Sequence, residues 1–155
     1  MARRIFFSFD HDGDLWRANQ VRNSDGVAGR EVAGFFDAGE YEEAQKQGRE
    51  GMERLIQKHL KNTAVTVVLI GAETANRPWV KYEIEQSITQ KNGLLGIYVG
   101  HMRGEDGRTP TQGLKPMVPP GVEFPAYSWD RDLERFTKEI EAAGKRSDAS
   151  RRRSW

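Results

Sequence analysis

Short apolar runs alternate along this chain with segments in which apolar residues return at helical spacing. The runs typical of buried parallel strands lie at residues 4–9, 32–37, 65–70, 94–99 and 122–127. Apolar residues three and four apart predict helices at residues 15–22, 41–61, 78–91 and 130–143. The chain is therefore predicted to alternate strands with helices from end to end.

This alternation predicts an α/β fold with a doubly wound parallel sheet. Five strands joined by right-handed crossovers fit a flavodoxin-like sheet with strand order 2-1-3-4-5. We expect one domain over residues 1–144, followed by a flexible basic tail at 145–155. Residues 23–30 and 100–120 are rich in glycine and polar side chains and are expected to be loops.

The net charge of +1 conceals an uneven distribution. Residues 145–155 hold five of the 24 basic residues and one of the 23 acidic residues. Residues 1–144 then hold 19 basic and 22 acidic residues, a net charge of −3. Because the body has no matching basic stripe, we interpret the tail as a solvated end and do not expect nucleic-acid binding.

Several classes of protein are excluded by composition. The chain has no cysteine, which removes disulfides, thiolate nucleophiles and cysteine-based zinc sites. No apolar stretch approaches the roughly 18–20 residues that span a bilayer, and the first residues lack a signal-peptide core, so we expect no membrane association and a cytoplasmic protein. Neither a glycine-rich dinucleotide fingerprint nor a phosphate loop is present. The three histidines lack metal-ligand spacing, and no metal is expected.

An acidic cluster, Asp10, Asp12 and Asp14, follows the first predicted strand. Response-regulator domains hold metal-binding acids at this place, but they also need an acceptor Asp at the end of the third strand and a Lys at the end of the fifth. Here the third strand ends in Ile70-Gly71, and residues 122–127 contain no Lys. We therefore reject phosphoryl transfer. For the cluster, turn and helix-cap chemistry and ligand binding both remain open.

The segment after the central strand carries the clearest candidate chemistry. Pro78 suits the first turn of a helix. Trp79 and Glu83 are four residues apart and hence on one helical face, at the sheet edge where open α/β folds bind ligands. A carboxylate beside an aromatic ring at that edge predicts a site for a sugar-nucleotide substrate. The alternatives are a solvated Glu and a Trp that only packs.

Three segments of the chain together resemble the Toll/interleukin-1 receptor (TIR) domain family. Phe6-Phe7-Ser8-Phe9 is similar to the first-strand motif of that family, and residues 65–71 are similar to its central strand. Trp79 to Ile84 is similar to its Trp-x-x-x-Glu helix, in which the Glu is catalytic in the NAD-consuming members. The closer resemblance, over roughly residues 3–143, is to the TIR-like sensor subunit of the bacterial Thoeris anti-phage system. Residues 23–41 show no motif of the family.

The resemblance implies an enzyme that cleaves the nicotinamide–ribose bond of NAD, of the NAD glycohydrolase or ADP-ribosyl cyclase type. Glu83 would be catalytic. The implied substrate-binding residues are Ser8, Phe9, Asp10, Asp12 and Trp79, with a ring of NAD stacked on Phe9 or Trp79. Because the leaving group is already cationic, one carboxylate near the ribose suffices to stabilise an oxocarbenium-like transition state. NAD would be a substrate, and no resident cofactor or metal is expected.

The implied product is a signalling nucleotide derived from ADP-ribose, which activates a separate effector protein during anti-phage defence. Self-association of the chain is a further expectation. One alternative is a catalytically silent TIR-like module for protein interaction. Another is a relative of the nucleoside deoxyribosyltransferases, which share the sheet and also use a Glu.

Overall fold

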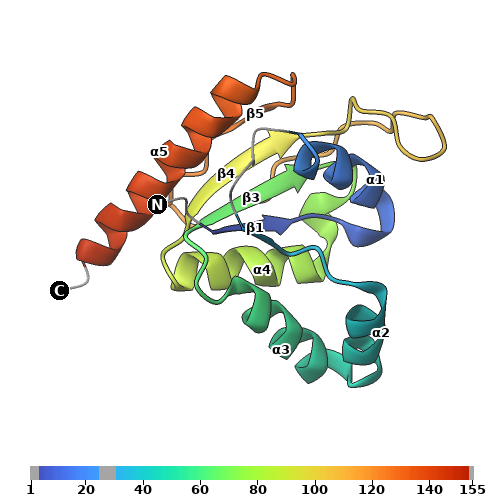
Figure 1. Cartoon of the computed structure of the whole chain (residues 1–155), viewed down its shortest axis with the longest axis horizontal. Coiled ribbons are helices and arrows are strands. Elements are labelled where there is room, and N and C mark those ends of the chain that lie inside the picture. Colours follow the sequence, from blue (N-terminus) through green and yellow to red (C-terminus); the bar gives the residue numbers. More distant parts are fainter. Residues whose placement is uncertain (1–3, 25–30, 154–155) are drawn as a thin grey trace.

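A computed structural model describes residues 4–24 and 31–153 of the chain, which form a five-stranded parallel sheet flanked by helices (Figure 1). The strands are β1 (Ile5–Ser8), β2 (Val32–Ala33), β3 (Val65–Ile70), β4 (Gly93–Tyr98) and β5 (Ala126–Ser128). Their order is β2-β1-β3-β4-β5, and every neighbouring pair is parallel. The predicted flavodoxin-like fold is therefore confirmed.

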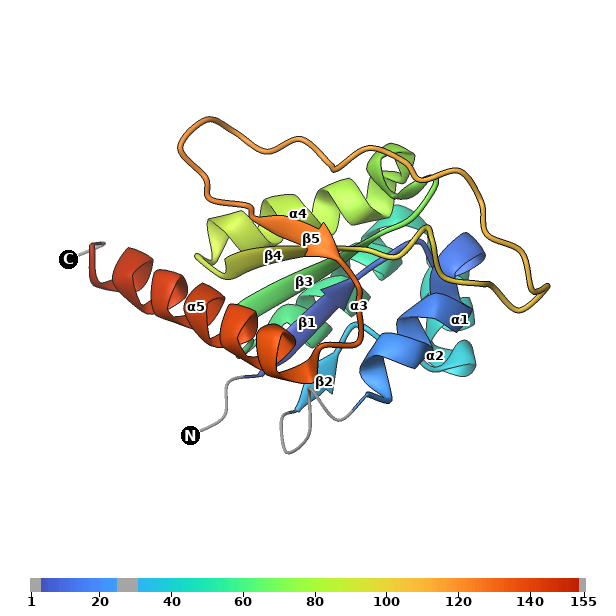
Figure 2. The same ribbon diagram turned by 90° about the horizontal axis from the view of Figure 1, so that it is seen from above.

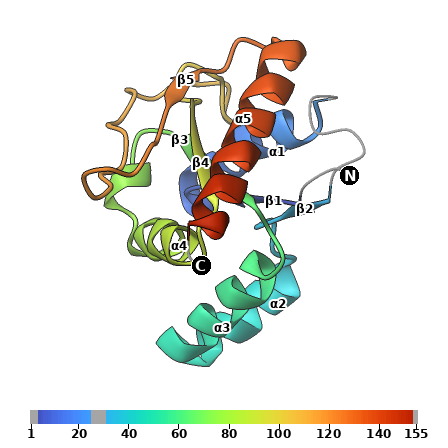
Figure 3. The same cartoon turned by 90° about the vertical axis from the view of Figure 1, so that its left-hand side faces the viewer.

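Helices cover both faces of the sheet, as Figure 3 shows from the side. The helices are α1 (His11–Arg22), α2 (Ala38–Lys46), α3 (Gly48–Leu60), α4 (Pro78–Thr89), α5 (Leu133–Arg152) and the short 3-10 turn η2 (Thr74–Asn76). Helices α1 and α5 pack on one face, and α3 and α4 pack on the other. None of the helices within the described residues combines the length and apolar character needed to span a bilayer.

Alternation along β1 decides which side chains reach which face. Ile5, Phe7 and Phe9 pack with α1 and α5, whereas Phe6 packs with α3. The Ser8 side chain points the same way as that of Phe6, because successive side chains of a strand alternate. Ser8 therefore lies under α4, at the carboxyl edge of the sheet.

Residues 41–61 form two helices, not the single helix that the pattern predicts. Helix α2 begins earlier, at Ala38, because Asp37 and Glu40 form a reciprocal capping box. The helical segment is interrupted just before Gly48, the first residue of α3, whose φ of +75° is rarely adopted by residues other than glycine. In the second half of the segment, the apolar residues at helical spacing, Met52, Leu55, Ile56 and Leu60, are buried.

Gly48→Ala should lower the free energy of unfolding by about 1 kcal/mol, because a methyl group disfavours the left-handed backbone at this break. No atom lies within 4 Å of the position its Cβ would take, so the cost is conformational and not steric. Chemical denaturation of the two proteins measures the difference. A variant as stable as the wild type would show that the break tolerates an L residue.

The boundary predicted at residue 144 is wrong. Helix α5 runs on to Arg152, so residues 145–152 belong to the domain. Ser147 donates to the carbonyl of Lys91 at 2.8 Å, and Arg146 donates to the carbonyl of Leu94 at 2.7 Å. These contacts hold the basic segment against the start of β4 and explain why it is not a free tail.

Other boundaries also differ from the predictions. Helix α1 begins at His11, earlier than the predicted residue 15, and its cap is Asp10, while Leu15 is 45% exposed. Strands β2 and β5 are shorter than expected. Of the loop predicted at 23–30, residues 25–30 lie outside the described residues. Figure 2 shows the long connection from β4 to β5 passing near α1 and then returning beside α4.

Candidate active site at the carboxyl edge of the sheet

A buried carboxylate and a buried hydroxyl meet where β1 ends under α4. Glu83, on the second turn of α4, is only 2% exposed. Ser8, the last residue of β1, donates a hydrogen bond of 2.7 Å from its Oγ to Oε1 of Glu83. The structure thus joins two of the six residues that the sequence analysis selected.

Burial changes the acidity of this carboxylate. Desolvation raises the pKa of Glu83 from 4.5 to about 8, and the hydrogen bond from Ser8 opposes part of that rise. A carboxyl group with a pKa this close to 7 changes its protonation state when a charged group binds beside it. Such perturbation at a sheet edge is typical of functional sites.

Aromatic rings from three segments gather near this carboxylate. The ring of His11 stacks on Phe36 and on Tyr41, with centroids 5.2 and 5.4 Å apart. Phe36 and Tyr41 are parallel to within 4°. Burial raises the pKa of the Tyr41 hydroxyl, and the carboxylates of Asp12, Glu83 and Asp10 raise it further. The Tyr41 hydroxyl therefore lies in the field of all three acids.

His11 itself is neutral in this environment. Burial lowers its pKa from 6.5 to about 4, although Asp10 and Asp12 act in the opposite direction. Its Nε2 atom is buried and has no hydrogen-bond partner within the described residues. The structure therefore holds a neutral imidazole beside Tyr41 with one polar atom that lacks a hydrogen-bond partner among the described residues.

The first two acids of the cluster have different tasks. Asp10 caps α1 by accepting from the backbone N–H of Asp12 at 3.1 Å, and it pairs with Nε of Arg77 at 3.1 Å. Asp10 is buried, and both of these contacts are made by its Oδ1 atom. Asp12 is exposed and lines a cleft of about 720 Å³ between the first turns of α1, residues 72–77 and residues 104–110. Asp10 lines the same cleft, but Asp12 is the more exposed of the two.

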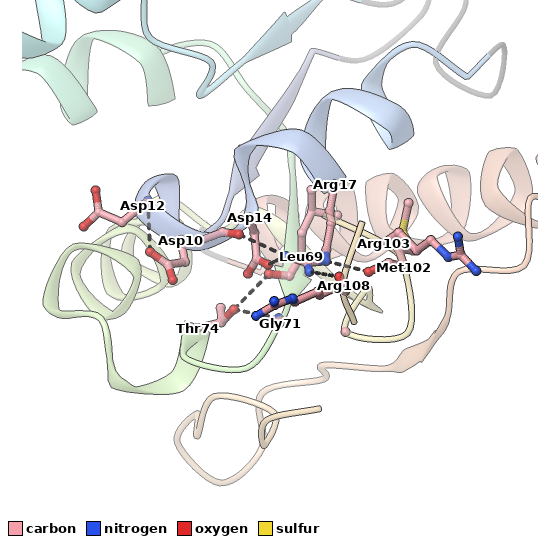
Figure 4. A network of polar contacts seen from close by, with 12 residues as sticks. Asp10, Asp12, Asp14, Arg17, Leu69, Gly71, Thr74, Met102, Arg103 and Arg108 are labelled. Atoms are coloured by element: carbon pink, nitrogen blue, oxygen red, sulfur yellow. Dashed lines mark hydrogen bonds and ion pairs between the residues drawn. The ribbon is translucent and has the colours of Figure 1, made fainter. Parts of the chain in front are cut away.

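The third acid belongs to a buried ion pair that fixes the far wall of this cleft (Figure 4). Arg17 contacts Asp14 Oδ1 at 2.9 Å and donates to the carbonyls of Gly13, Met102 and Arg108 at 3.0, 2.8 and 3.2 Å. Burial raises the pKa of Asp14, and Arg17 counteracts that rise. The cluster Asp10, Asp12 and Asp14 does not converge, and no metal-binding group of three or more acids and histidines occurs in the part of the chain that the structure describes.

Trp79 lies apart from that cleft. Its ring meets Tyr82 edge to face at 5.7 Å and packs, half-buried, against α2 and α3. With Met52 it lines a groove of about 600 Å³ at the break between α2 and α3. Trp79 therefore lines the groove between α2 and α3, whereas Asp12 lines the cleft beside α1, although Trp79 shares α4 with Glu83.

The prediction that Phe9 lines a cleft disagrees with its position. Phe9 is 1% exposed and belongs to the core between the sheet and helices α1 and α5. The alternation of β1 continues one residue beyond the strand, which turns Phe9 away from Ser8 and Glu83. Its ring stacks on His11 at 4.2 Å, so its contribution to the site is to support that imidazole.

Phe9→Leu should lower the free energy of unfolding by about 1–1.5 kcal/mol, since an apolar side chain of smaller volume replaces a fully buried ring. Leu15→Ala, on the exposed side of α1, should change it by less than about 0.5 kcal/mol. Thermal or chemical unfolding of both variants gives the comparison. A larger loss for Leu15→Ala would contradict the observed orientation of α1.

Sequence reasoning missed His11, Tyr41 and Arg77. The signal for Tyr41 was available: Asp37 followed by Glu40 is a capping-box pattern, which starts a helix at residue 38 and puts Tyr41 in its first turns. Metal-ligand spacing does not single out His11, and the predicted start of the first helix at residue 15 leaves it outside that helix, whereas the helix begins at His11. The partner of Arg77 depends on tertiary packing, and no local pattern indicates it.

The comparisons with known proteins agree with this architecture. The family model described as "Thoeris protein ThsB, TIR-like domain" matches residues 6–103, which include Ser8, Tyr41 and Glu83. A protein of Bacillus cereus (strain MSX-D12) named "Putative cyclic ADP-D-ribose synthase ThsB1" is 39% identical over 126 residues. That alignment covers 80% of this chain and 66% of the relative, so the chain spans just under two thirds of the relative's length.

Proposed function

Because the chain belongs to the family of Thoeris ThsB proteins with a TIR-like domain, we propose that it consumes NAD, releasing nicotinamide and a nucleotide derived from ADP-ribose. The relative named for cyclic ADP-D-ribose synthesis supports this proposal. In this proposal NAD is a substrate and not a resident cofactor. The product serves as a signal in anti-phage defence, read by a separate effector protein.

The observation that carries the proposal is the buried carboxylate of Glu83, bonded at 2.7 Å to a neutral hydroxyl. No basic side chain is among the causes that set its pKa, so no ion pair would neutralise the negative charge that Glu83 carries once it ionises. A carboxylate in a dry site is an effective electrostatic partner for a cation that forms beside it. Glu83 is proposed as the catalytic residue on this ground.

In the proposed reaction, the bond between C1′ of the ribose and N1 of the nicotinamide breaks. Both electrons of that bond pass to N1, so the cationic ring leaves as neutral nicotinamide. The positive charge moves to the ribose as an oxocarbenium ion, which the Glu83 carboxylate stabilises. Attack by water on C1′ gives ADP-ribose, and attack by an adenine nitrogen of the same molecule gives a cyclic product; each releases one proton.

The charge of the substrate helps to prepare the carboxylate. With a pKa of about 8, Glu83 is mostly protonated at pH 7 in the free protein. A cationic nicotinamide ring beside it favours the ionised form and lowers that pKa. Asp12, which acts on the Tyr41 hydroxyl together with Glu83, adds to the attraction for the cationic nicotinamide ring. We propose Asp12, Tyr41 and His11 as the residues nearest the bound substrate.

The buried state of Glu83 bears on regulation. At 2% exposure, the carboxylate is reached only after the side chains above it move. We propose that an activating trigger or self-association opens the site, and that the isolated chain turns over slowly. The same observation favours the second candidate function, a silent interaction module in which Glu83 stays covered.

One assay separates the two functions. Purified protein is incubated with NAD over a range of protein concentrations, and nicotinamide, ADP-ribose and cyclic products are followed by chromatography. Nicotinamide release that rises per molecule with concentration would support both the reaction and its activation. Complete absence of release at every concentration, with and without lysate of infected cells as a source of activator, would favour the silent module.

A further inference from the structure

We propose that Ser8 is a positioning residue for the Glu83 carboxylate and not a ligand of the substrate. The inference rests on the proposed function, since it concerns the carboxylate assigned there. Ser8 has no exposed surface, so a molecule in the site does not touch it while β1 and α4 keep their places. Its hydroxyl is within 2.7 Å of Glu83 Oε1 and donates its proton to that atom.

The fold directs the single hydrogen-bond donor of the Ser8 side chain at Glu83. It is the last residue of β1 and is paired in register with Val68 of the central strand. A buried hydroxyl has one proton to donate, and a buried donor is almost always satisfied by one partner. Oε1 of Glu83 accepts this hydrogen bond, which fixes the rotation of the carboxylate and leaves Oε2 for the substrate.

A separate network holds the backbone of Glu83. Ser87, one turn further along α4, donates to the Glu83 carbonyl at 2.7 Å and lies 2.7 Å from Thr66 Oγ1 on β3. Asn92 donates to the same Thr66 hydroxyl at 3.0 Å. The helix is thus anchored independently of Ser8, and the role of Ser8 is confined to the carboxylate.

This separation supplies a matched control. Ser8→Ala and Ser87→Ala each delete one buried hydroxyl next to Glu83, but only the first removes a contact to its carboxylate. A hydrogen bond to a charged group is worth about 1.5–3 kcal/mol, which corresponds to one to two units of pKa. Ser8→Ala should therefore raise the pKa of Glu83 by about one unit or more, and Ser87→Ala should leave it unchanged.

The experiment follows the Glu83 carboxyl carbon by NMR titration in protein labelled with ¹³C-glutamate, for the wild type and both variants. Glu83→Gln identifies the signal. An upward shift in Ser8→Ala alone supports the proposal. Equal titration in Ser8→Ala and wild type, or an equal shift in both serine variants, overturns it. This readout does not depend on turnover.

Kinetics with NAD complete the test. For a positioning residue, Ser8→Ala should lower kcat by roughly tenfold, move the pH profile of kcat/KM upward and leave KM near its wild-type value. Ser8→Thr, which keeps the hydroxyl, should restore part of the loss. A raised KM with unchanged kcat and pH profile would make Ser8 a substrate ligand and overturn the proposal. A wild type that stays inactive at every protein concentration, with and without a source of activator, would reject the proposed function, whereas a persisting NMR shift would retain the coupling of Ser8 to Glu83.

Discussion

Glu83→Gln should reduce nicotinamide release from NAD by roughly 10²–10³-fold, equivalent to about 3–4 kcal/mol of transition-state stabilisation. Gln keeps the volume of the side chain and still accepts a hydrogen bond from Ser8, but it carries no charge to oppose the oxocarbenium ion. The loss should fall on kcat more than on KM, because the charge develops only in the transition state. Initial rates measured by chromatography, under the conditions that activate the wild type, give the ratio.

Glu85→Gln is the control for this substitution. Glu85 lies on the same helix but is exposed and borders a different groove, beside residues 114–119. The same loss of a negative charge there should change the rate by less than about twofold. Equal activity of Glu83→Gln and wild type would remove Glu83 from the mechanism.

The second large effect is on stability: the substitution that lowers activity should raise the free energy of unfolding. Glu83→Gln should gain roughly 4 kcal/mol of unfolding free energy relative to the wild type between pH 5 and pH 9. The unfolded chain releases the Glu83 proton near pH 4.5, whereas the folded protein holds it until about pH 8. Unfolding within that window releases a proton, so rising pH destabilises the wild type at about 1.4 kcal/mol per unit. The variant has no proton to release.

Urea denaturation at pH 5, 7 and 9 measures this difference. The stability of the wild type relative to Glu83→Gln should fall through that range and become constant above pH 8. Glu85→Gln, on the exposed side of α4, should show no such trend. A constant difference between wild type and Glu83→Gln across the range would mean that Glu83 ionises as easily in the folded protein as in the unfolded chain.

The strands and their order could be predicted from the sequence because parallel strands buried on both faces read as continuous apolar runs. The run at residues 65–70 matches β3 to the residue. The helix break at Gly48 could not be found from hydrophobic spacing, because the apolar stripe resumes beyond it in nearly the same phase. The end of α5 was misplaced because its last turns are polar and are held by contacts to β4, which are distant in sequence.

The candidate site was predictable in part. Glu83 and Ser8 were selected by resemblance to a known family, and the structure brings them into contact. Phe9 was assigned to the cleft because it ends the first strand, but period-two alternation places it opposite Ser8, in the core. Position at the correct edge of a sheet does not determine the face to which a side chain points. Asp10 was selected as a ligand-binding acid, and its engagement with Arg77 depends on packing between α1 and α4.

The Arg17 contacts have a consequence for how strongly a molecule could bind in the cleft beside α1. The guanidinium ties the carbonyls of Met102 and Arg108, at the two ends of a seven-residue segment, to the start of that helix. Ordering a free segment costs about 1 kcal/mol or more of conformational entropy per residue, and that cost is subtracted from affinity when ordering accompanies binding. Here Arg17 completes the ordering during folding, so a molecule entering the cleft meets a wall that is already formed and retains more of its contact energy as affinity.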